Sequence, residues 1–264
     1  MVDKVNFLIV GAQKSGTSAL EKYLEAHPDI QLAKKKEVHF FDNEEYYSSE
    51  VDYTKYYQFF AESSRTAKGE CTPIYMYWRP AIKRIYEYNP SMKIIAVLRS
   101  PIDRAYSHWN MERDRNSDKL DFSTAIRTES HRCREALPLQ HRVYSYCDRG
   151  FYTEQIRHIW RYFPKKQTLF IKYEDLKLNP NVVIKRICQF LCVSESDPIK
   201  EQKVHVRPYV EAMNESDRQY LNEVFTSEIS QLEQMLGWDC TDWRYKTGYF
   251  KKYSLKNLIR KLSS

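Results

Sequence analysis

The sequence of 264 residues contains no long hydrophobic run. The apolar run nearest the N-terminus, residues 5–10, is only as long as a β-strand, and Asp3 and Lys4 directly precede it. A membrane-spanning helix needs about 20 apolar residues, and a signal peptide needs a longer apolar region than this one. We therefore expect no signal peptide, no membrane anchor and no transmembrane segment.

The chain also lacks paired cysteines of the Cys-x-x-Cys type, and no histidine lies near a cysteine at zinc-finger spacing. Its six cysteines are scattered: Cys71, Cys133, Cys147, Cys188, Cys192 and Cys240. This distribution indicates free thiols of a reducing compartment rather than a disulfide framework or a metal site. We expect a cytoplasmic protein.

No repeat, low-complexity stretch or concentrated basic arm occurs in the sequence. The chain has 42 Lys and Arg and 35 Asp and Glu, so its net charge is +7, spread along its length. The charge favours an anionic ligand, while its even spread argues against nucleic acid as a partner. The length suits one α/β domain with a sizeable core. The sequence does not indicate an oligomeric state.

Residues 5–25 have the pattern of a strand, a glycine-bounded loop and a helix. The strand ends at Gly11, the loop closes at Gly16, and apolar residues then recur at helical spacing. Backbone N–H groups at a helix N-terminus lack intrahelical partners, and the helix dipole is positive there. Lys14 adds a full charge to the loop. The pattern predicts a phosphate-binding loop, and the alternative is an ordinary tight turn with an exposed lysine.

The loop differs from a Walker A motif in the position of its lysine. In Walker A the lysine directly follows the second glycine and precedes Ser or Thr. Here Thr17 follows Gly16, and Lys14 lies two residues before that glycine. The Lys-Ser/Thr pair that normally places Mg²⁺ is therefore missing, and we expect phosphate binding without a metal ion.

Two other stretches carry polar groups in suggestive patterns. Arg99 follows an apolar strand expected over residues 92–98, and Ser107 comes one or two helical turns later. A guanidinium and a hydroxyl at this spacing can both reach a terminal phosphate, although Arg99 alone would read as a surface charge. Arg104 lies near them and could equally be a charge on a helix face.

The second stretch, residues 36–42, reads Lys-Glu-Val-His-Phe-Phe-Asp. In a strand, Glu37 and His39 would project to the same face. A carboxylate beside an imidazole can take a proton from an acceptor, and either group could be the base. The structural alternative is a surface ion pair of Glu37 with a neighbouring lysine and a packed core histidine. Asp42 is a supporting candidate.

These stretches, in this order, resemble the motifs of sulfotransferases that use 3′-phosphoadenylyl sulfate (PAPS). Residues 11–18 look like the 5′-phosphosulfate loop, and residues 98–109 look like the 3′-phosphate element. Residues 37–42 are similar to the Glu-Val-His-Phe-Phe-Asp segment of heparan-sulfate-type and bacterial small-molecule or polyketide sulfotransferases. The resemblance spans roughly residues 5–243.

The resemblance implies transfer of a sulfuryl group from PAPS to a hydroxyl, or to an amine, of a small-molecule or glycan acceptor by in-line displacement. Lys14 would stabilise the leaving phosphate, and Glu37 or His39 would be the base. The absent anchor points to a bacterial-type enzyme, such as those of natural-product biosynthesis. The expected cofactor-binding residues are Lys14, Ser15, Gly16, Thr17, Ser18, Arg99, Ser107, Tyr152, Lys203 and Arg207.

Three further features of the sequence agree with or depart from the pattern of this family. Tyr152 lies in a Gly-Phe-Tyr segment like the one near the nucleotide in the family. Lys203 and Arg207 fall where relatives have a basic loop over the cofactor, but the usual Gly-Arg pattern is missing. Cys71 stands where heparan-sulfate relatives have a catalytic lysine, which weakens the case for a heparan-type acceptor.

Strands alternate with helices along the chain, which predicts an α/β fold: a P-loop-like, doubly wound sheet of mainly parallel strands flanked by helices. Besides the first strand and helix, we expect strands ending near residue 71 and over 92–98 and 168–173. We expect helices over about 80–88, 101–112, 122–130, 151–163, 181–192 and 217–236, and a short helix near 53–60.

The expected domain covers residues 1–245, and two segments stand apart from it. Residues 113–147 are polar, basic and irregular, and we interpret them as an insertion over the substrate side of the site or as a solvated surface excursion. Residues 246–264 form a basic amphipathic tail that could lie on a membrane surface or, as such tails more often do, pack on protein.

Two other functions fit parts of the pattern. A P-loop-type small-molecule kinase would need Mg²⁺ and the Walker pair, and the position of Lys14 counts against it. A non-catalytic nucleotide- or anion-binding module would keep ligand affinity without transfer, and Glu37 would then have no role.

Overall fold

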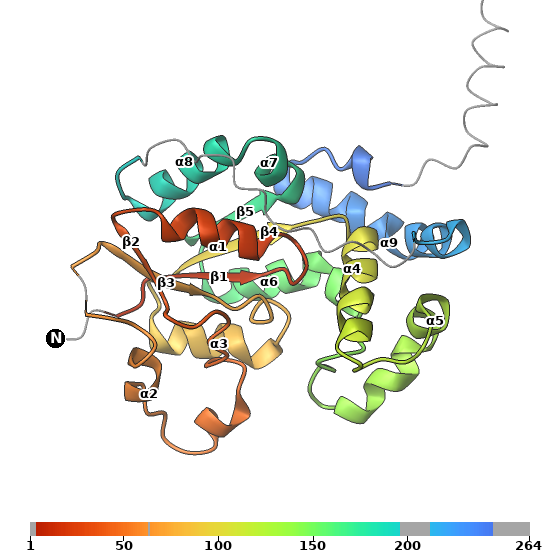
Figure 1. The fold of residues 1–264 in the computed structure, drawn as a ribbon, viewed down its shortest axis with the longest axis horizontal. Coiled ribbons are helices and arrows are strands. Elements are labelled where there is room, and N and C mark those ends of the chain that lie inside the picture. Colours follow the sequence, from red (N-terminus) through yellow and green to blue (C-terminus); the bar gives the residue numbers. More distant parts are fainter. Residues whose placement is uncertain (1–3, 63, 196–211, 245–264) are drawn as a thin grey trace, which may run out of the picture.

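The computed structural model of the protein describes residues 4–62, 64–195 and 212–244. Five strands form one sheet with helices packed on both faces (Figure 1). The strands are β1 (Phe7–Gly11), β2 (Ile30–Leu32), β3 (Ala67–Cys71), β4 (Lys93–Leu98) and β5 (Thr168–Lys172). The α-helices of the described residues are α1 (Thr17–Glu25), α2 (Thr54–Tyr57), α3 (Arg79–Tyr88), α4 (Pro101–Asp114), α5 (Phe122–Arg132), α6 (Tyr152–Tyr162), α7 (Tyr173–Leu178), α8 (Pro180–Leu191) and α9 (Glu215–Leu236).

The sheet is parallel, with strand order β2-β3-β1-β4-β5. β1 lies in its centre, where Phe7 is in register with Gly69 of β3 on one side and Lys93 of β4 on the other. The chain leaves β1 toward β2 on one side and later adds β4 on the other. The carboxyl end of β1 is therefore the topological switch point, where α/β folds bind ligands.

Alternate residues of the central strand face two separate layers of helices. Phe7 and Ile9 pack with buried residues of α1, α7 and α8, whereas Leu8 and Val10 pack with α3, α4, α6 and α9. Both sets are fully buried, as period-2 alternation in a sheet covered on both faces requires. In Figure 1, α1, α7 and α8 lie on one side of the sheet and α3 and α6 lie on the other.

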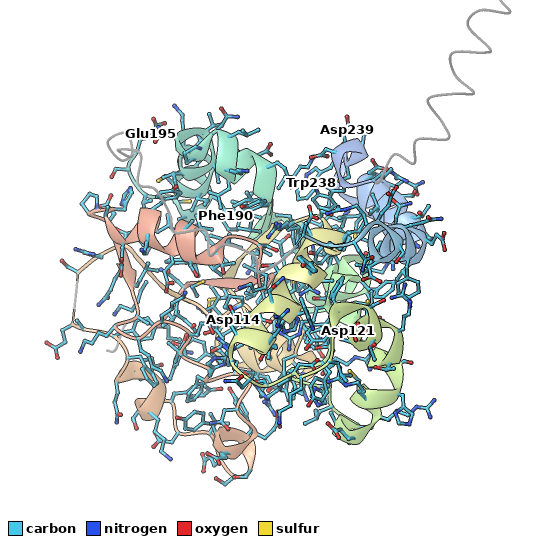
Figure 2. The ribbon with its side chains drawn as sticks, turned by 45° about the vertical axis from the view of Figure 1, so that its right-hand side comes forward. Asp114, Asp121, Phe190, Glu195, Trp238 and Asp239 are labelled. Atoms are coloured by element: carbon cyan, nitrogen blue, oxygen red, sulfur yellow. The ribbon has the colours of Figure 1, made fainter. Side chains whose placement is uncertain are left out.

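Residues 113–147 form an excursion that contains α5. Asp114 ends α4, and Asp121 caps α5 by accepting a hydrogen bond from the N–H of Thr124 at 2.9 Å. Figure 2 labels both aspartates at the ends of the connection between the two helices. Phe122 and Ile126 anchor α5 to the core, so this excursion is packed against the domain.

The expected fold class is confirmed. Each strand and long helix expected from the sequence is present, with ends shifted by a few residues, and β2 and α7 were not foreseen. Residues 37–42 are not the strand we considered, because they form an irregular loop in which Glu37 and His39 have φ angles of 52° and 58°. Within the described residues, no helix is both long and apolar enough to cross a bilayer.

Candidate active site

The sequence motifs meet at the carboxyl edge of the sheet, because each follows a different parallel strand. The loop of residues 11–18 follows β1, and residues 37–42 follow β2 after a short turn. Thr72 follows β3, and Arg99 follows β4. Since the carboxyl ends of parallel strands lie on one edge, four stretches distant in sequence build one site.

The loop after β1, which we call the donor loop, presents an uncapped helix N-terminus. Gly16 is the N-cap of α1 and, without a side chain, provides no side-chain cap to the first turn. The backbone N–H groups at the start of a helix have no intrahelical partner and carry the positive end of the dipole. This arrangement suits an anion such as phosphate.

Only glycine fits position 16 of the donor loop. Its φ of +87° is unfavourable for other residues, and a Cβ there would lie 2.9 Å from the ring of Tyr173. The Tyr173 ring also lies 5.0 Å from the guanidinium of Arg99. The close approach of α1 to Tyr173 thus places the donor loop beside Arg99.

The polar residues of the donor loop have different placements. Lys14 is partly exposed, has a φ of 71° and accepts a hydrogen bond at its carbonyl from Arg99 Nη1 at 3.3 Å. Ser15 is fully buried, and its N–H donates to the carbonyl of Ala12 at 3.1 Å, so its side chain faces the interior. Ser18 is partly exposed and accepts from Lys36 Nζ at 2.5 Å.

Of the residues expected at the 3′-phosphate, Arg99 contacts the donor loop through the carbonyl of Lys14. Ser107 is nearly buried at 9% exposure. Tyr152 is fully buried, and its hydroxyl donates to the carbonyl of Arg99 at 2.9 Å, so Tyr152 supports Arg99 from behind. Arg104 is fully buried and donates to the carbonyl of Tyr146, so it is not the surface charge considered from the sequence.

The irregular loop of residues 37–42 is held by hydroxyls that follow β3. The N–H of Phe40 donates to the Tyr75 hydroxyl at 2.9 Å, and the N–H of His39 lies 3.5 Å from Thr72 Oγ1. Both hydroxyls donate to the buried carboxylate of Glu70, at 2.9 Å and 2.5 Å. Burial raises the pKa of Glu70 to about 7. Glu70 therefore orients the two hydroxyls that accept hydrogen bonds from the backbone of the loop.

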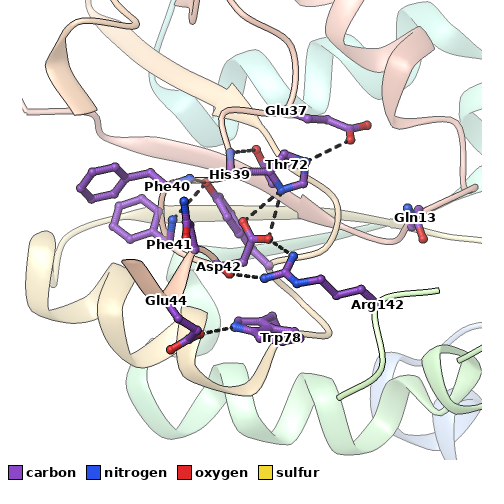
Figure 3. Close-up of polar contacts among 12 residues, drawn as sticks. Gln13, Glu37, His39, Phe40, Phe41, Asp42, Glu44, Thr72, Trp78 and Arg142 are labelled. Carbon is purple, nitrogen blue, oxygen red and sulfur yellow. Dashed lines mark hydrogen bonds and ion pairs between the residues drawn. The ribbon is translucent and has the colours of Figure 1, made fainter. Parts of the chain in front are cut away.

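Glu37, His39 and Asp42 form a chain of side chains within that loop (Figure 3). Glu37 Oε2 lies 3.5 Å from His39 Nε2, and the Asp42 oxygens lie 3.1 and 3.0 Å from His39 Nδ1. The side chains of Glu37 and His39 are 35% and 41% exposed, whereas that of Asp42 is 1% exposed. Glu37 and His39 are thus partly exposed to solvent, and Asp42 anchors the chain from the interior.

The contacts in this chain favour its charged forms. Hydrogen bonds to Asp42 and then to Glu37 raise the pKa of His39 to about 9, against the effect of burial. The hydrogen bond from His39 lowers the pKa of Glu37. Burial acts to raise the pKa of Asp42, but hydrogen bonds from His39 and Arg142 outweigh it and lower the pKa. At neutral pH the chain is therefore carboxylate, imidazolium, carboxylate.

Two arginines of the site have no signal in the sequence. Arg142 Nη1 donates to Asp42 Oδ2 at 2.6 Å, and Arg149 Nη1 donates to the side chain of Gln13 at 2.6 Å. Both lie in or next to the polar stretch 113–147, where many Lys and Arg residues look alike. Only the fold distinguishes the arginines that turn toward the donor loop and Asp42.

Cys71 is 1% exposed, and its Sγ lies 3.9 Å from the carbonyl of Thr17. Burial raises the pKa of its thiol well above the usual value, so the thiol stays neutral. The position where relatives are expected to have a lysine therefore carries no charge here.

A cavity of about 370 Å³ lies away from these residues, between α5 and α9. None of the expected site residues that the structure describes lines it. Lys203 and Arg207, expected to close over a cofactor, lie outside the described residues, as does the tail of residues 246–264.

The sequence profile of the "Sulfotransferase domain" family matches residues 4–237. Human heparan sulfate glucosamine 3-O-sulfotransferase 6 is 31% identical over 188 residues, which are 70% of this chain and 51% of the relative. The human bifunctional heparan sulfate N-deacetylase/N-sulfotransferase 3 is 31% identical over 198 residues, or 71% of this chain and 22% of the relative. The chain thus spans about half the length, or less, of these two relatives.

Solved structures give a similar result. A sulfotransferase from Alicyclobacillus acidocaldarius is 29% identical, with a TM-score of 0.78 over 92% of this chain and 100% of that protein. A mouse sulfotransferase complexed with PAP has a TM-score of 0.53 at 18% identity, over 88% of this chain and 86% of the other. The second likeness bears on the fold alone.

Proposed function

Because the chain belongs to the sulfotransferase domain family, we propose that it transfers a sulfuryl group from PAPS to a hydroxyl of a small-molecule or glycan acceptor. The observation that carries the proposal is the meeting of an uncapped helix N-terminus with the Glu37–His39–Asp42 chain at one edge of the sheet. The first suits a phosphate, and the second suits removal of a proton.

The described residues fit a nucleotide donor with two phosphate positions. The N-terminus of α1, with Gly16, Thr17 and Ser18, would hold the 5′-phosphate. Arg99, fixed by Tyr152 and Tyr173, and Ser107 on α4 would hold a 3′-phosphate. PAPS would supply a sulfuryl group on a good leaving phosphate. The buried Ser15 side chain would support the loop from inside rather than contact the donor.

Glu37 is the proposed base, since His39 at neutral pH carries protons on both ring nitrogens. With a pKa of about 9, the imidazolium donates toward Asp42 and Glu37 and has no lone pair for a new proton. Glu37 stays ionised and is the outermost carboxylate of the chain. It would accept the acceptor's hydroxyl proton as the new S–O bond forms.

Lys14 is the proposed partner of the leaving phosphate. As the bond between sulfur and the bridging oxygen breaks, negative charge grows on that oxygen. A fixed ammonium and helix N–H groups stabilise this charge without rearrangement. Lys14 lies in the loop directly ahead of the N-terminus of α1, which supports this role.

A hydroxyl acceptor is favoured by the first relative, named as a 3-O-sulfotransferase, and an amine is the alternative that the N-sulfotransferase relative offers. The neutral Cys71 removes one cation from the acceptor side. We therefore favour an acceptor that carries less negative charge than a heparan chain and needs fewer cations in the protein to bind it. A cytoplasmic role in natural-product biosynthesis remains part of this proposal.

Isothermal titration tests the donor site without an acceptor. The protein is titrated with 3′-phosphoadenosine 5′-phosphate (PAP), ADP and ATP, with and without Mg²⁺. We expect PAP to bind at least about tenfold more tightly than ADP, because only PAP engages Arg99 and Ser107. Lys14→Ala and Arg99→Ala should lose most of this affinity, while Lys22→Ala, an exposed lysine of α1, should keep it.

The outcome separates the three functions considered from the sequence. Tighter binding of ATP, enhanced by Mg²⁺, would favour a kinase and overturn the proposal. PAP affinity without any turnover of PAPS would leave a binding module. Glu37→Gln should keep PAP affinity and lower turnover by about 100-fold or more, since only the base is removed.

A further inference from the structure

The side chain of Arg142 is fixed on three sides although 43% of it is exposed. Its Nη1 donates to Asp42 Oδ2 at 2.6 Å, and its Nη2 donates to the main-chain carbonyl of the same residue. Its guanidinium lies 4.1 Å from the centre of the Trp78 ring. A flexible surface ion pair would show one contact, so this geometry indicates a held group.

The platform under Arg142 is itself fixed. Trp78 is 3% exposed, and its indole N–H donates to Glu44 Oε1 at 2.9 Å. Arg84 binds the same carboxylate through both of its terminal nitrogens. Figure 3 shows Glu44, Trp78 and Arg142 in succession next to Asp42. Arg142 is thus held in one orientation by residues outside its own segment.

Arg149 connects the segment of Arg142 to the donor loop. It is 3% exposed, and its Nη2 donates to the carbonyl of Arg142 at 2.7 Å. Its Nη1 donates to Gln13 of the donor loop, and its Nε donates to Ser145 Oγ at 2.8 Å. The stretch after α5 therefore touches the donor loop and the Glu37–His39–Asp42 chain at once.

The loop of residues 37–42 needs such support. Glu37 and His39 both adopt left-handed backbone angles, which are unfavourable for residues other than glycine. Asp42 is the one buried member of the chain and contacts His39 through both oxygens. Its orientation decides where the imidazole, and hence Glu37, can lie.

We propose that Arg142 is a positioning residue of the sulfotransferase reaction, which holds Asp42 behind His39 so that Glu37 stays aimed at the donor loop. This inference rests on the proposed function. It gives the excursion of residues 113–147 a role in building the site. Glu37, His39, Asp42 and Arg142 then form a row of alternating negative and positive charges.

Other titratable groups also lie near Asp42 and influence its pKa. His39 lies on its own loop, and the buried Glu70 and Tyr75 lie on and after β3. Glu70 opposes ionisation of Asp42, while His39 and Arg142 favour it. Removal of Arg142 therefore leaves His39 as the remaining cation bonded to Asp42.

The variants are Arg142→Ala and Arg142→Lys, with Arg132→Ala as the matched control. Arg132 belongs to α5 in the same excursion, bonds Asp118 at 2.9 Å and stacks on Tyr144 at 3.6 Å. It repeats the pairing of an arginine with an aspartate and an aromatic ring, but it does not touch Asp42. Thermal unfolding of each variant checks that the fold is intact.

The first measurement is made without any ligand. Carbon-13 NMR of aspartate carboxyls, assigned with Asp42→Asn, follows the titration of Asp42. We expect Arg142→Ala to raise the pKa of Asp42 by about one unit or more, because an opposite charge in contact is lost. Arg142→Lys should raise it less, and Arg132→Ala should leave it unchanged.

The second measurement is hydrolysis of PAPS in the absence of an acceptor, together with PAP affinity. We expect Arg142→Ala to lower kcat by ~10-fold to ~100-fold, with KM for PAPS and PAP affinity within about twofold of the parent protein. The rise of its activity with pH should shift to higher pH, since Asp42 and the groups linked to it lose their protons at higher pH than in the parent protein. Arg142→Lys should recover part of kcat.

The inference is overturned if Asp42 titrates unchanged in Arg142→Ala, or if kcat falls equally in Arg132→Ala. An equal loss of PAP affinity and kcat would also overturn it, since that pattern indicates damage to the donor loop. If the parent protein does not bind PAP, the proposed function fails by itself. The Asp42 titration still decides whether Arg142 holds the chain.

Discussion

The side chain of His39 lies between two carboxylates, and this position decides its charge at neutral pH. Asp42 and Glu37 both stabilise the protonated ring, which raises the pKa of His39 to about 9. A histidine exposed to water would be mostly neutral at pH 7. The folded protein thus holds a cation at this position that the unfolded chain does not.

This charge predicts a dependence of stability on pH. The pKa of His39 is higher in the folded state than the usual 6.5, so its contribution is complete below about pH 6.5 and is lost as the pH rises through about 9. A shift of this size would be worth about 3 kcal/mol if fully buried. Because the ring is 41% exposed, screening reduces our expectation to roughly 1 kcal/mol.

Urea unfolding at pH 6.5 and pH 9.5 measures this difference. The free energy of unfolding of the parent protein should fall by roughly 1 kcal/mol more than that of His39→Gln over this range. His131→Gln, which removes an exposed histidine of α5, serves as the control and should behave like the parent. An identical pH dependence in His39→Gln would contradict the assigned charge.

At the scale of elements, the junction of β1 and α1 is where fold and proposed function depend on the same backbone. Gly16 turns the chain with a φ of +87° and leaves room for Tyr173. The turn directs the N-terminus of α1 to the carboxyl edge of the sheet. A side chain here would disturb both the helix start and the ring that stacks on Arg99.

Gly16→Ala should therefore destabilise the protein and remove PAP binding. Gly237 provides a matched control, because it ends α9 with a φ of +66° and a Cβ there would meet no atom within 4 Å. Gly237→Ala should cost about 1 kcal/mol from its backbone angle alone. Gly16→Ala should cost more, since the clash with Tyr173 adds to the same angle.

Thermal unfolding and PAP titration of both variants make the comparison. We expect Gly237→Ala to retain the PAP affinity of the parent protein, and Gly16→Ala to lose it. Equal melting temperatures and equal PAP affinities for the two variants would show that the approach of Tyr173 to the donor loop has no consequence.

At the scale of the whole molecule, the candidate site is assembled from several elements of the fold. The donor loop, the Glu37–His39–Asp42 chain, Thr72 and Arg99 belong to four successive strands, and Arg142 comes from the excursion around α5. The parallel sheet brings these parts together, and two layers of helices hold it in place. A ligand at this edge should stabilise the fold as a whole.

PAP should therefore raise the melting temperature. At a concentration of about 100 times its dissociation constant, a ligand that binds only the folded state adds about 2.7 kcal/mol. For a domain of this size we expect an increase of ~5 to ~10 °C. Differential scanning fluorimetry with PAP and with equimolar ADP measures it, and Arg99→Ala should abolish the difference between the two nucleotides.

A melting temperature that rises equally with PAP and ADP would contradict a site for the 3′-phosphate at Arg99 and Ser107. Only the proposed 5′-phosphate site at the N-terminus of α1 would then remain. The two phosphate positions are thus tested separately by one pair of ligands.

The sequence predicted most of the elements because their signals are local. Alternation and apolar runs mark strands buried on both faces, and Pro101, Pro164 and Pro180 lie at helix boundaries. β2 has three residues and α7 has six, too few for a period to emerge. The strand considered for residues 37–42 is an irregular loop instead. It is held by Thr72, Tyr75 and Glu70, which no local pattern connects to it.

By itself, the sequence determined the fold class, the strand, loop and helix of residues 5–25 and the order of the motifs, since these depend on residues close together in the chain. The tertiary structure decided which groups meet. Hydrogen bonds such as that between Arg142 and Asp42 join residues 100 positions apart, and no local pattern distinguishes Arg142 from Arg132. The charge of His39 depends on such contacts too, because a pKa is set by the groups that surround a side chain in space.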